Sequence, residues 1–319
     1  MLKVVIIGYG EMFANMIAGT LDSGSKIVGV FRHDRIKYPR PIRWIKDIIN
    51  PDTDYNYIKS YKLHEIKATS ANSESFRKQL LKLNPDIMIV ASWSEKLDKK
   101  TFDMPKTATI NVHPSLLPKY RGPNPYAQVI KNREKKSGVT LHLMDKNYDS
   151  GAILDQREVE ILDTDTGKEL KSKTALIARG AICELLQKMS EDVVFPIMQK
   201  EDQATYFSNE FDTDLDFNKP IEDTIAQIRA INPWGKTYFY YKNEVFTPNP
   251  YRLTIIDCDT KGEKIGTIID KDYKDKSLTI VCPNNKLLRM GNLKLYGTIK
   301  RIFTKEYIKR FVKINDVVK

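Results

Sequence analysis

Residues 3–31 read KVVIIGYGEMFANMIAGTLDSGSKIVGVF, and this stretch decides the fold class. Its opening run, KVVII, is apolar and β-branched after the lysine and ends at Gly8, which is the pattern of a strand buried on both faces. We expect a strand over residues 3–7, a helix over 11–21 and a second strand over 26–31. A strand, a helix and a strand joined by short turns form the unit from which parallel sheets are built.

The same alternation continues along the chain. The hydrophobic pattern predicts a helix over residues 75–83 and further strands over 86–91, 109–112 and 138–144. The predicted fold class is therefore α/β, with a Rossmann-like, mostly parallel sheet and helices on both of its faces. In such sheets ligands bind beyond the carboxyl ends of the strands, so a site is expected at that edge.

The turn Gly8-Tyr9-Gly10 after the first strand is a partial dinucleotide-binding signature. Phe13 stands where the third glycine of that signature would allow the helix to pack closely on the strand. A tight turn is therefore the favoured interpretation, and no nicotinamide or flavin cofactor is expected.

The last third of the chain has a different pattern. An amphipathic helix over residues 166–189 is followed by a polar connection over 191–212 and a short helix over 221–231. Short β-like runs then alternate with Gly, Asn, Asp and Pro, which is typical of a small β-barrel. We therefore expect a first domain over residues 1–207 and an OB-like β-barrel domain over residues 208–319.

Composition and charge limit the classes of protein. The 41% hydrophobic and 29% charged residues are typical of a folded chain. Three widely spaced cysteines, no signal peptide and no apolar run of about 20 residues predict a cytoplasmic protein without disulfides, a metal site or a membrane partner. Residues 218–319 hold 20 Lys and Arg against 11 Asp and Glu, out of a net charge of +11 for the chain. This excess of nine suits a nucleic acid, although free use of lysine in an AT-rich genome explains it equally well.

Three polar residues fall at the expected edge of the sheet. Asn111 and His113 end the run TINVH, and Asp149 follows in a later loop. An asparagine can donate a hydrogen bond to an oxyanion, an imidazole can stabilise it or carry a proton, and a carboxylate can orient the imidazole. Such a set can move an acyl group between nucleophiles without a metal. Each motif alone is more typical of a turn or loop, and His142 in the neighbouring strand is interpreted as structural.

The order of these motifs resembles one family. The runs NVHPSLLPKYRG (111–122), GVT (138–140) and MDKNYDSG (144–151) closely resemble the 10-formyltetrahydrofolate-dependent formyltransferases, and the resemblance covers nearly the whole chain. The run INPWGKTYF (231–239) resembles the start of the C-terminal domain of methionyl-tRNA formyltransferases. The resemblance implies transfer of a formyl group from 10-formyltetrahydrofolate, as co-substrate, to a free amine.

The resemblance also implies a role for each polar residue. Asn111 would donate to the oxygen that gains charge as the amine attacks the formyl carbon. His113 would stabilise that oxygen as a second donor or carry a proton. Asp149 would hold His113 and, through water, take the proton that the amine sheds.

The binding residues are expected on the strand that ends VASWSEKL and on the loop after His113. The resemblance implies that the folate contacts Ile89, Val90, Ala91, Ser92, Trp93, Leu97, Ser115, Leu116, Leu117 and Pro118. The residues expected to meet substrate phosphates are Lys119, Arg121, Arg40 and Arg43. The alternatives are that Trp93 only packs in the fold and that Lys119 and Arg121 belong to an exposed basic loop.

Two readings of the accepting amine remain. The INPW-type C-terminal domain and its basic excess favour methionyl-tRNA. A nucleotide-linked amino sugar is the alternative, because sugar formyltransferases share the catalytic core. Residues 32–69 differ from the glycine- and lysine-rich loop with which methionyl-tRNA formyltransferases reach the acceptor arm of tRNA, and this departure keeps both readings open. Formylation of glycinamide ribonucleotide and a non-catalytic nucleic-acid-binding role are both disfavoured.

Overall fold

The computed structural model describes residues 1–32, 53–260 and 262–319, and the chain divides into two units. The first unit comprises residues 1–125, 136–160 and 171–208. The second comprises residues 126–135, 161–170 and 209–319, so two early segments group with the C-terminal part of the chain. The sequence pattern also predicts a short helix near residues 42–49, and these residues lie outside the described part of the chain.

The first unit is built on a six-stranded sheet with the order β2-β1-β3-β4-β5-β6. Strands β1 to β4 are parallel to one another, and β5 pairs antiparallel with both β4 and β6. This confirms the predicted mostly parallel sheet. The strands are β1 (Lys3–Gly8), β2 (Lys26–Arg32), β3 (Ile87–Ala91), β4 (Ala108–His113), β5 (Lys136–Leu143) and β6 (Ile153–Glu160). The helices are α1 (Gly10–Asp22), α3 (Thr53–Ser60), α4 (Glu74–Leu83), α5 (Lys99–Phe102), α7 (Gly167–Ser190, whose first turn belongs to the second unit) and the 3-10 turn η1 (Glu201–Gln203).

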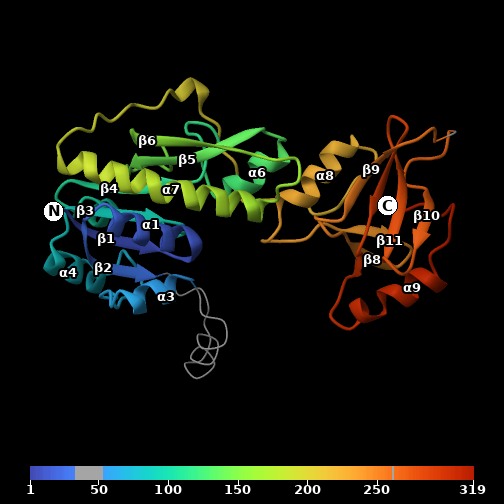
Figure 1. Ribbon diagram of the computed structural model, residues 1–319, viewed down its shortest axis with the longest axis horizontal. Helices are drawn as coiled ribbons and strands as arrows, with labels where there is room; N and C mark the ends of the chain where they lie inside the picture. The colour runs from blue at the N-terminus through green and yellow to red at the C-terminus, as the bar shows by residue number, and fades with distance from the viewer. Residues whose placement is uncertain (33–52, 261) are drawn as a thin grey trace. The chain divides into compact units, whose positions relative to one another are not determined.

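Helices cover both faces of this sheet (Figure 1), as expected. Apolar side chains of α1 and α7 pack on one face, and those of α4 and α5 pack on the other. Neighbouring residues of a strand point to opposite faces. Ile110 and Val112 of β4 belong to the core under α1 and α7, so Asn111 and His113 project from the opposite face.

The turn after β1 serves packing. A Cβ atom added at Gly8 would lie 2.1 Å from the carbonyl oxygen of Ala91, so only glycine fits there. At the start of α1, the amide of Gly10 donates to the buried carboxylate of Asp54 at 3.2 Å. A carboxylate of the chain itself thus occupies the helix N-terminus on which a dinucleotide phosphate would lie, which supports the tight-turn interpretation.

The second unit is the expected small β domain. Its strands form two antiparallel sheets, with the orders β10-β11-β12-β9 and β13-β8-β7, around one shared core. The strands are β7 (Phe239–Tyr241), β8 (Glu244–Thr247), β9 (Leu253–Asp257), β10 (Ile268–Asp272), β11 (Ser277–Cys282), β12 (Lys286–Met290) and β13 (Lys294–Leu295). The helices are α6 (Pro125–Lys131), α8 (Ile221–Ala230), α9 (Thr304–Arg310) and the 3-10 turn η2 (Lys300–Phe303). Across the described parts of both units, no helix has the length and apolar character that crossing a bilayer requires.

The INPWG run joins the early segments to the second unit. Asn232 donates from Nδ2 to the Thr166 hydroxyl at 2.9 Å. The ring of Trp234 stacks on that of Tyr126, with centroids 5.6 Å apart. These contacts explain why the two early segments group with residues 209–319.

Candidate active site

Strand β4 supplies the first two polar residues of the site. Asn111 and His113 are two residues apart and therefore share a face of the sheet. In the antiparallel pairing of β4 with β5, Asn111 lies opposite His142, and His113 lies opposite Thr140. Opposed residues of such a pair have Cβ atoms about 4.5–5.5 Å apart on the same face. The register itself therefore brings His142 beside Asn111.

Asp149 enters from the loop between β5 and β6, in a left-handed backbone conformation with φ of 54°. Its Oδ2 atom accepts from the amide of Gly122 at 2.9 Å. Its Oδ1 atom accepts from Asn111 Nδ2 at 3.2 Å and lies 3.5 Å from His113 Nδ1. The side chains of Asp149 and His113 are 12% and 5% exposed. The three predicted residues thus meet around one nearly buried carboxylate oxygen.

The partners of His113 decide which ring nitrogen carries the proton. Nε2 lies 2.8 Å from the carbonyl oxygen of Tyr120, which can only accept, so Nε2 carries a hydrogen. In the neutral ring, Nδ1 then holds a lone pair and faces Asp149 Oδ1. A proton delivered to Nδ1 would complete an ion pair with this carboxylate.

His142 sets the orientation of the Asn111 amide. His142 Nδ1 donates to the carbonyl of Leu143 at 2.8 Å, which leaves Nε2 as an acceptor 3.1 Å from Asn111 Nδ2. Both neighbours of Asn111 Nδ2, namely His142 Nε2 and Asp149 Oδ1, are acceptors, so the nitrogen of the amide must face them. The interpretation of His142 as structural therefore missed a contact to the site, and only the β4–β5 register signals this contact.

Burial and charge control the protonation of the site. Burial lowers the pKa of His113 below its usual value of about 6.5, and the nearby Asp149 carboxylate opposes this shift without cancelling it. Burial works to raise the pKa of Asp149, but the two imidazoles and the Gly122 amide outweigh it and hold that pKa far below its usual range. At neutral pH the site therefore presents a neutral imidazole beside an ionised carboxylate.

These groups suit the transfer of an acyl group to an amine. The amide of Asn111 can donate to an oxygen that gains negative charge, and the neutral ring of His113 can accept the proton that the amine loses. Among residues 1–32, 53–260 and 262–319, no three His, Cys, Asp or Glu side chains gather as a metal-binding group.

Two family models match the chain. The model described as formyl transferase matches residues 2–186, and the model described as formyl transferase, C-terminal domain, matches residues 209–311. The chain belongs to the formyl transferase family.

This formyl transferase is similar to curated relatives over most of its length. It is 32% identical to the methionyl-tRNA formyltransferase of Halothermothrix orenii over 244 residues, which are 75% of this chain and 76% of that relative. It is 29% identical to the methionyl-tRNA formyltransferase of Caldanaerobacter subterraneus subsp. tengcongensis over 310 residues, which are 96% of each chain. The solved N-formyltransferase from Helicobacter canadensis, in complex with folinic acid and dTDP-3-aminofucose, covers 91% of this chain and 99% of its own with a TM-score of 0.67. At 18% identity, this last similarity shows a shared fold.

The side chains of most residues predicted to bind folate on and after β3 are packed inside the first unit of the formyl transferase. This group comprises Ile89, Val90, Ala91 and, on the following loop, Leu97. The ring of Trp93 packs on Phe31, with centroids 5.4 Å apart, which supports packing over stacking on a ligand. Ser92 follows the last residue of β3 and has a left-handed backbone conformation, with φ of 55°. Contact of these residues with a folate stays a prediction.

The loop after His113 is braced by β5. Ser115 is fully buried, and its carbonyl oxygen accepts from the Thr140 hydroxyl at 2.6 Å. The same hydroxyl accepts from the amide of Leu117 at 3.2 Å. Leu116 and Pro118 are half-buried. The role of this loop in binding folate also stays a prediction.

The residues predicted to contact substrate phosphates are placed differently from one another. Lys119 is exposed. Arg121 is buried, and its guanidinium faces the side chains of Gln199 and Glu201 at 2.8 and 2.7 Å. Arg40 and Arg43 lie outside the described residues. A contact of any of the four with substrate stays a prediction.

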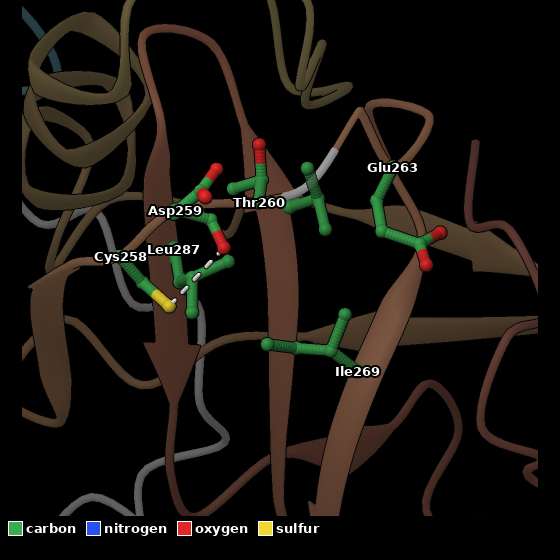
Figure 2. Close-up of a pocket in the computed structure, with 7 residues that line it drawn as sticks. Cys258, Asp259, Thr260, Glu263, Ile269 and Leu287 are labelled. Carbon is green, nitrogen blue, oxygen red and sulfur yellow. Dashed lines mark hydrogen bonds between the residues drawn. The ribbon is translucent and has the colours of Figure 1, made fainter.

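A separate small pocket lies in the C-terminal domain of the formyl transferase (Figure 2). Its lining residues are Cys258, Asp259, Thr260, Glu263, Ile269, Val281 and Leu287. Its volume of about 140 Å³ is below the roughly 300–1,000 Å³ of ordinary ligand sites. None of the predicted site residues that the structure describes lines this pocket, and it is too small for a folate.

Proposed function

We propose that this formyl transferase moves a formyl group from 10-formyltetrahydrofolate to the free amine of methionyl-tRNA. The observation that carries the proposal is the extent of the match to relatives of that name, which reaches 96% of both chains and so includes the C-terminal domain. The excess of nine positive charges in residues 218–319 fits a polyanionic substrate.

The polar residues of the site have distinct roles in this proposal. Bound 10-formyltetrahydrofolate supplies the formyl carbonyl. Asn111 donates from Nδ2 to the formyl oxygen as its charge develops, and this bond replaces one of the two that Nδ2 makes to His142 Nε2 and Asp149 Oδ1. His113 Nδ1 takes up the proton that the attacking amine sheds, and Asp149 stabilises the resulting imidazolium. The imidazolium then returns this proton to N10 of the folate as the bond between N10 and the formyl carbon breaks. This division follows from the proton positions. His113 Nδ1 faces the carboxylate at 3.5 Å without a hydrogen, whereas His142 Nε2, at 3.7 Å, already accepts from Asn111.

An amino sugar on a nucleotide is the second candidate acceptor. The observation that favours it is the segment of residues 32–69, which is rich in Tyr, Lys and Pro and differs from the family loop that reaches the acceptor arm of tRNA. The related fold of the Helicobacter canadensis protein binds dTDP-3-aminofucose, so this architecture accommodates such a substrate in that protein.

A formylation assay tests the proposal. The purified chain is given 10-formyltetrahydrofolate with initiator methionyl-tRNA or, separately, with a panel of nucleotide-linked amino sugars. We expect formylmethionyl-tRNA as the product of the first reaction and a much slower formation of it in the Asn111→Ala variant. Product on a sugar amine with none on the charged tRNA would replace the proposed acceptor with the alternative.

A further inference from the structure

Residues 197–207 run beside both loops of the site, and we call this segment the strap. At its start, the backbone of Ile197 pairs with that of Ile153, and each amide donates at 2.8 Å to the other carbonyl. At its end, Arg121 donates its amide to the carbonyl of Thr205 at 2.8 Å and accepts from the amide of Phe207 at 3.0 Å. The strap therefore contacts the loop that contains Gly122 as well as the chain that follows Asp149.

Gln199 is the side chain of the strap that reaches the Asp149 turn. Its Nε2 atom donates to the carbonyl oxygens of Asp149 and Gly151, both at 2.8 Å. Its Oε1 atom accepts from Nε and Nη2 of Arg121 at 3.2 and 2.8 Å. The residue is 9% exposed, and both its donor and its acceptor ends are in use. A buried amide with these bonds has one preferred orientation, because any rotation leaves polar groups unpaired.

Glu201 holds Arg121 in turn. Its two carboxylate oxygens accept from Nη1 and Nη2 of Arg121 at 2.9 and 2.7 Å, which is the bidentate geometry of a strong ion pair. Gly122, the next residue, donates its amide to Asp149 Oδ2 at 2.9 Å. The network from Glu201 through Arg121 to Gln199 therefore reaches both the carboxylate end and the backbone end of Asp149.

We propose that Gln199 is a positioning residue for Asp149, a role that rests on the proposed catalytic function of that carboxylate. Asp149 adopts a left-handed conformation that residues other than glycine occupy sparsely, so the fold must hold it there. The two hydrogen bonds from Gln199 hold the carbonyls on either side of the turn and thereby the direction in which the carboxylate faces His113. A displacement of about 1 Å in such a group can lower the rate by roughly a hundredfold.

Two substitutions test this role. Gln199→Ala removes the side chain, whereas Gln199→Glu keeps its size and a partner for Arg121 but cannot donate to the two carbonyls. Gln203→Ala, at an exposed glutamine of the same strap, is the matched control. Each variant is assayed for kcat and KM separately, and the His113 imidazole is titrated by NMR.

We expect both Gln199 variants to lower kcat by about tenfold to a hundredfold with little change in KM, while Gln203→Ala behaves as wild type. In Gln199→Ala, which adds no charge, the pKa of His113 should fall further, since the carboxylate that opposes the effect of burial has moved away. Wild-type kcat together with an unchanged His113 titration in Gln199→Glu would overturn the proposal. Should Gln199→Ala fail to fold, the test rests on Gln199→Glu. If Asp149→Asn instead proves fully active, the catalytic proposal fails, while the titration still shows whether Gln199 holds the carboxylate.

Discussion

Asp149 Oδ1 has three nitrogen neighbours, with Asn111 Nδ2 at 3.2 Å, His113 Nδ1 at 3.5 Å and His142 Nε2 at 3.7 Å. Only the first of these nitrogens must carry hydrogens in the neutral site, because each ring donates from its other nitrogen to a backbone carbonyl. The Asp149 carboxylate can therefore stabilise one additional positive charge on a neighbouring group. A proton accepted by His113 supplies that charge, which is why this residue is assigned the proton transfer.

Removing the Asn111 amide tests the oxygen-binding role. We expect Asn111→Ala to lower kcat by about 10²–10³-fold, the usual effect of losing one donor to a developing oxyanion. Asn147→Ala, in the exposed loop before Asp149, is the control and should leave kcat unchanged. Equal activity of the two variants would remove Asn111 from the mechanism.

The lowered pKa of His113 predicts the pH dependence of the reaction. Because burial favours the neutral ring, the proton-accepting form persists below pH 6.5, and activity should fall only as the pH drops past the lowered pKa. Asp149→Asn removes the charge that opposes burial, so the NMR titration of His113 should move to still lower pH. An acidic limb above pH 6.5, or a titration that moves upward in Asp149→Asn, contradicts this assignment.

At the scale of elements, the strap and the loop that contains Gly122 depend on each other. Gly122 has φ of +101°, and a Cβ atom added there would lie 2.4 Å from the carbonyl oxygen of Phe207 in the strap. Gly24 also has a positive φ, of +77°, but an added Cβ would meet nothing within 4 Å.

Alanine at these two glycines therefore separates backbone strain from collision with the strap. We expect Gly24→Ala to lower the free energy of unfolding by about 1 kcal/mol and Gly122→Ala to lower it by about 2–3 kcal/mol, with a loss of kcat. Urea denaturation measures both changes. If the two variants lose equal stability and keep full activity, the strap does not brace the loop.

Several elements were predictable because their patterns are local. The apolar runs of β1 and β3 are unbroken. Asn111 and His113 lie at the carboxyl end of β4, and in parallel sheets ligands bind beyond that end of the strands. Strand β6 was not predicted, because its polar positions include the paired Asp155 and Arg157 and none of its residues is buried. Gln199 carries no local signal at all, since its partners are about 50 and 78 residues away.

In the molecule as a whole, the excess of positive charge lies in the C-terminal domain, to which no catalytic residue is assigned. Residues 218–319 carry the excess of nine positive charges, and the candidate active site lies in the first unit. If this charge binds tRNA phosphates, the affinity of the full chain for initiator tRNA should fall at least tenfold between about 50 and 200 mM salt. Filter binding at a series of salt concentrations measures this change in affinity. An affinity that does not change with salt would mean that the excess of lysine does not bind tRNA.

The most direct measurement is a competition for one limiting formyl group. The full chain is mixed with substoichiometric 10-formyltetrahydrofolate, initiator methionyl-tRNA and a nucleotide-linked amino sugar at equal concentrations, and mass spectrometry locates the transferred formyl group. We expect nearly all of it on the methionyl amine, and a transfer about 10²–10³-fold slower with the Asn111→Ala variant. A formyl group found mainly on the sugar, or transferred equally well without Asn111, would contradict the proposed function.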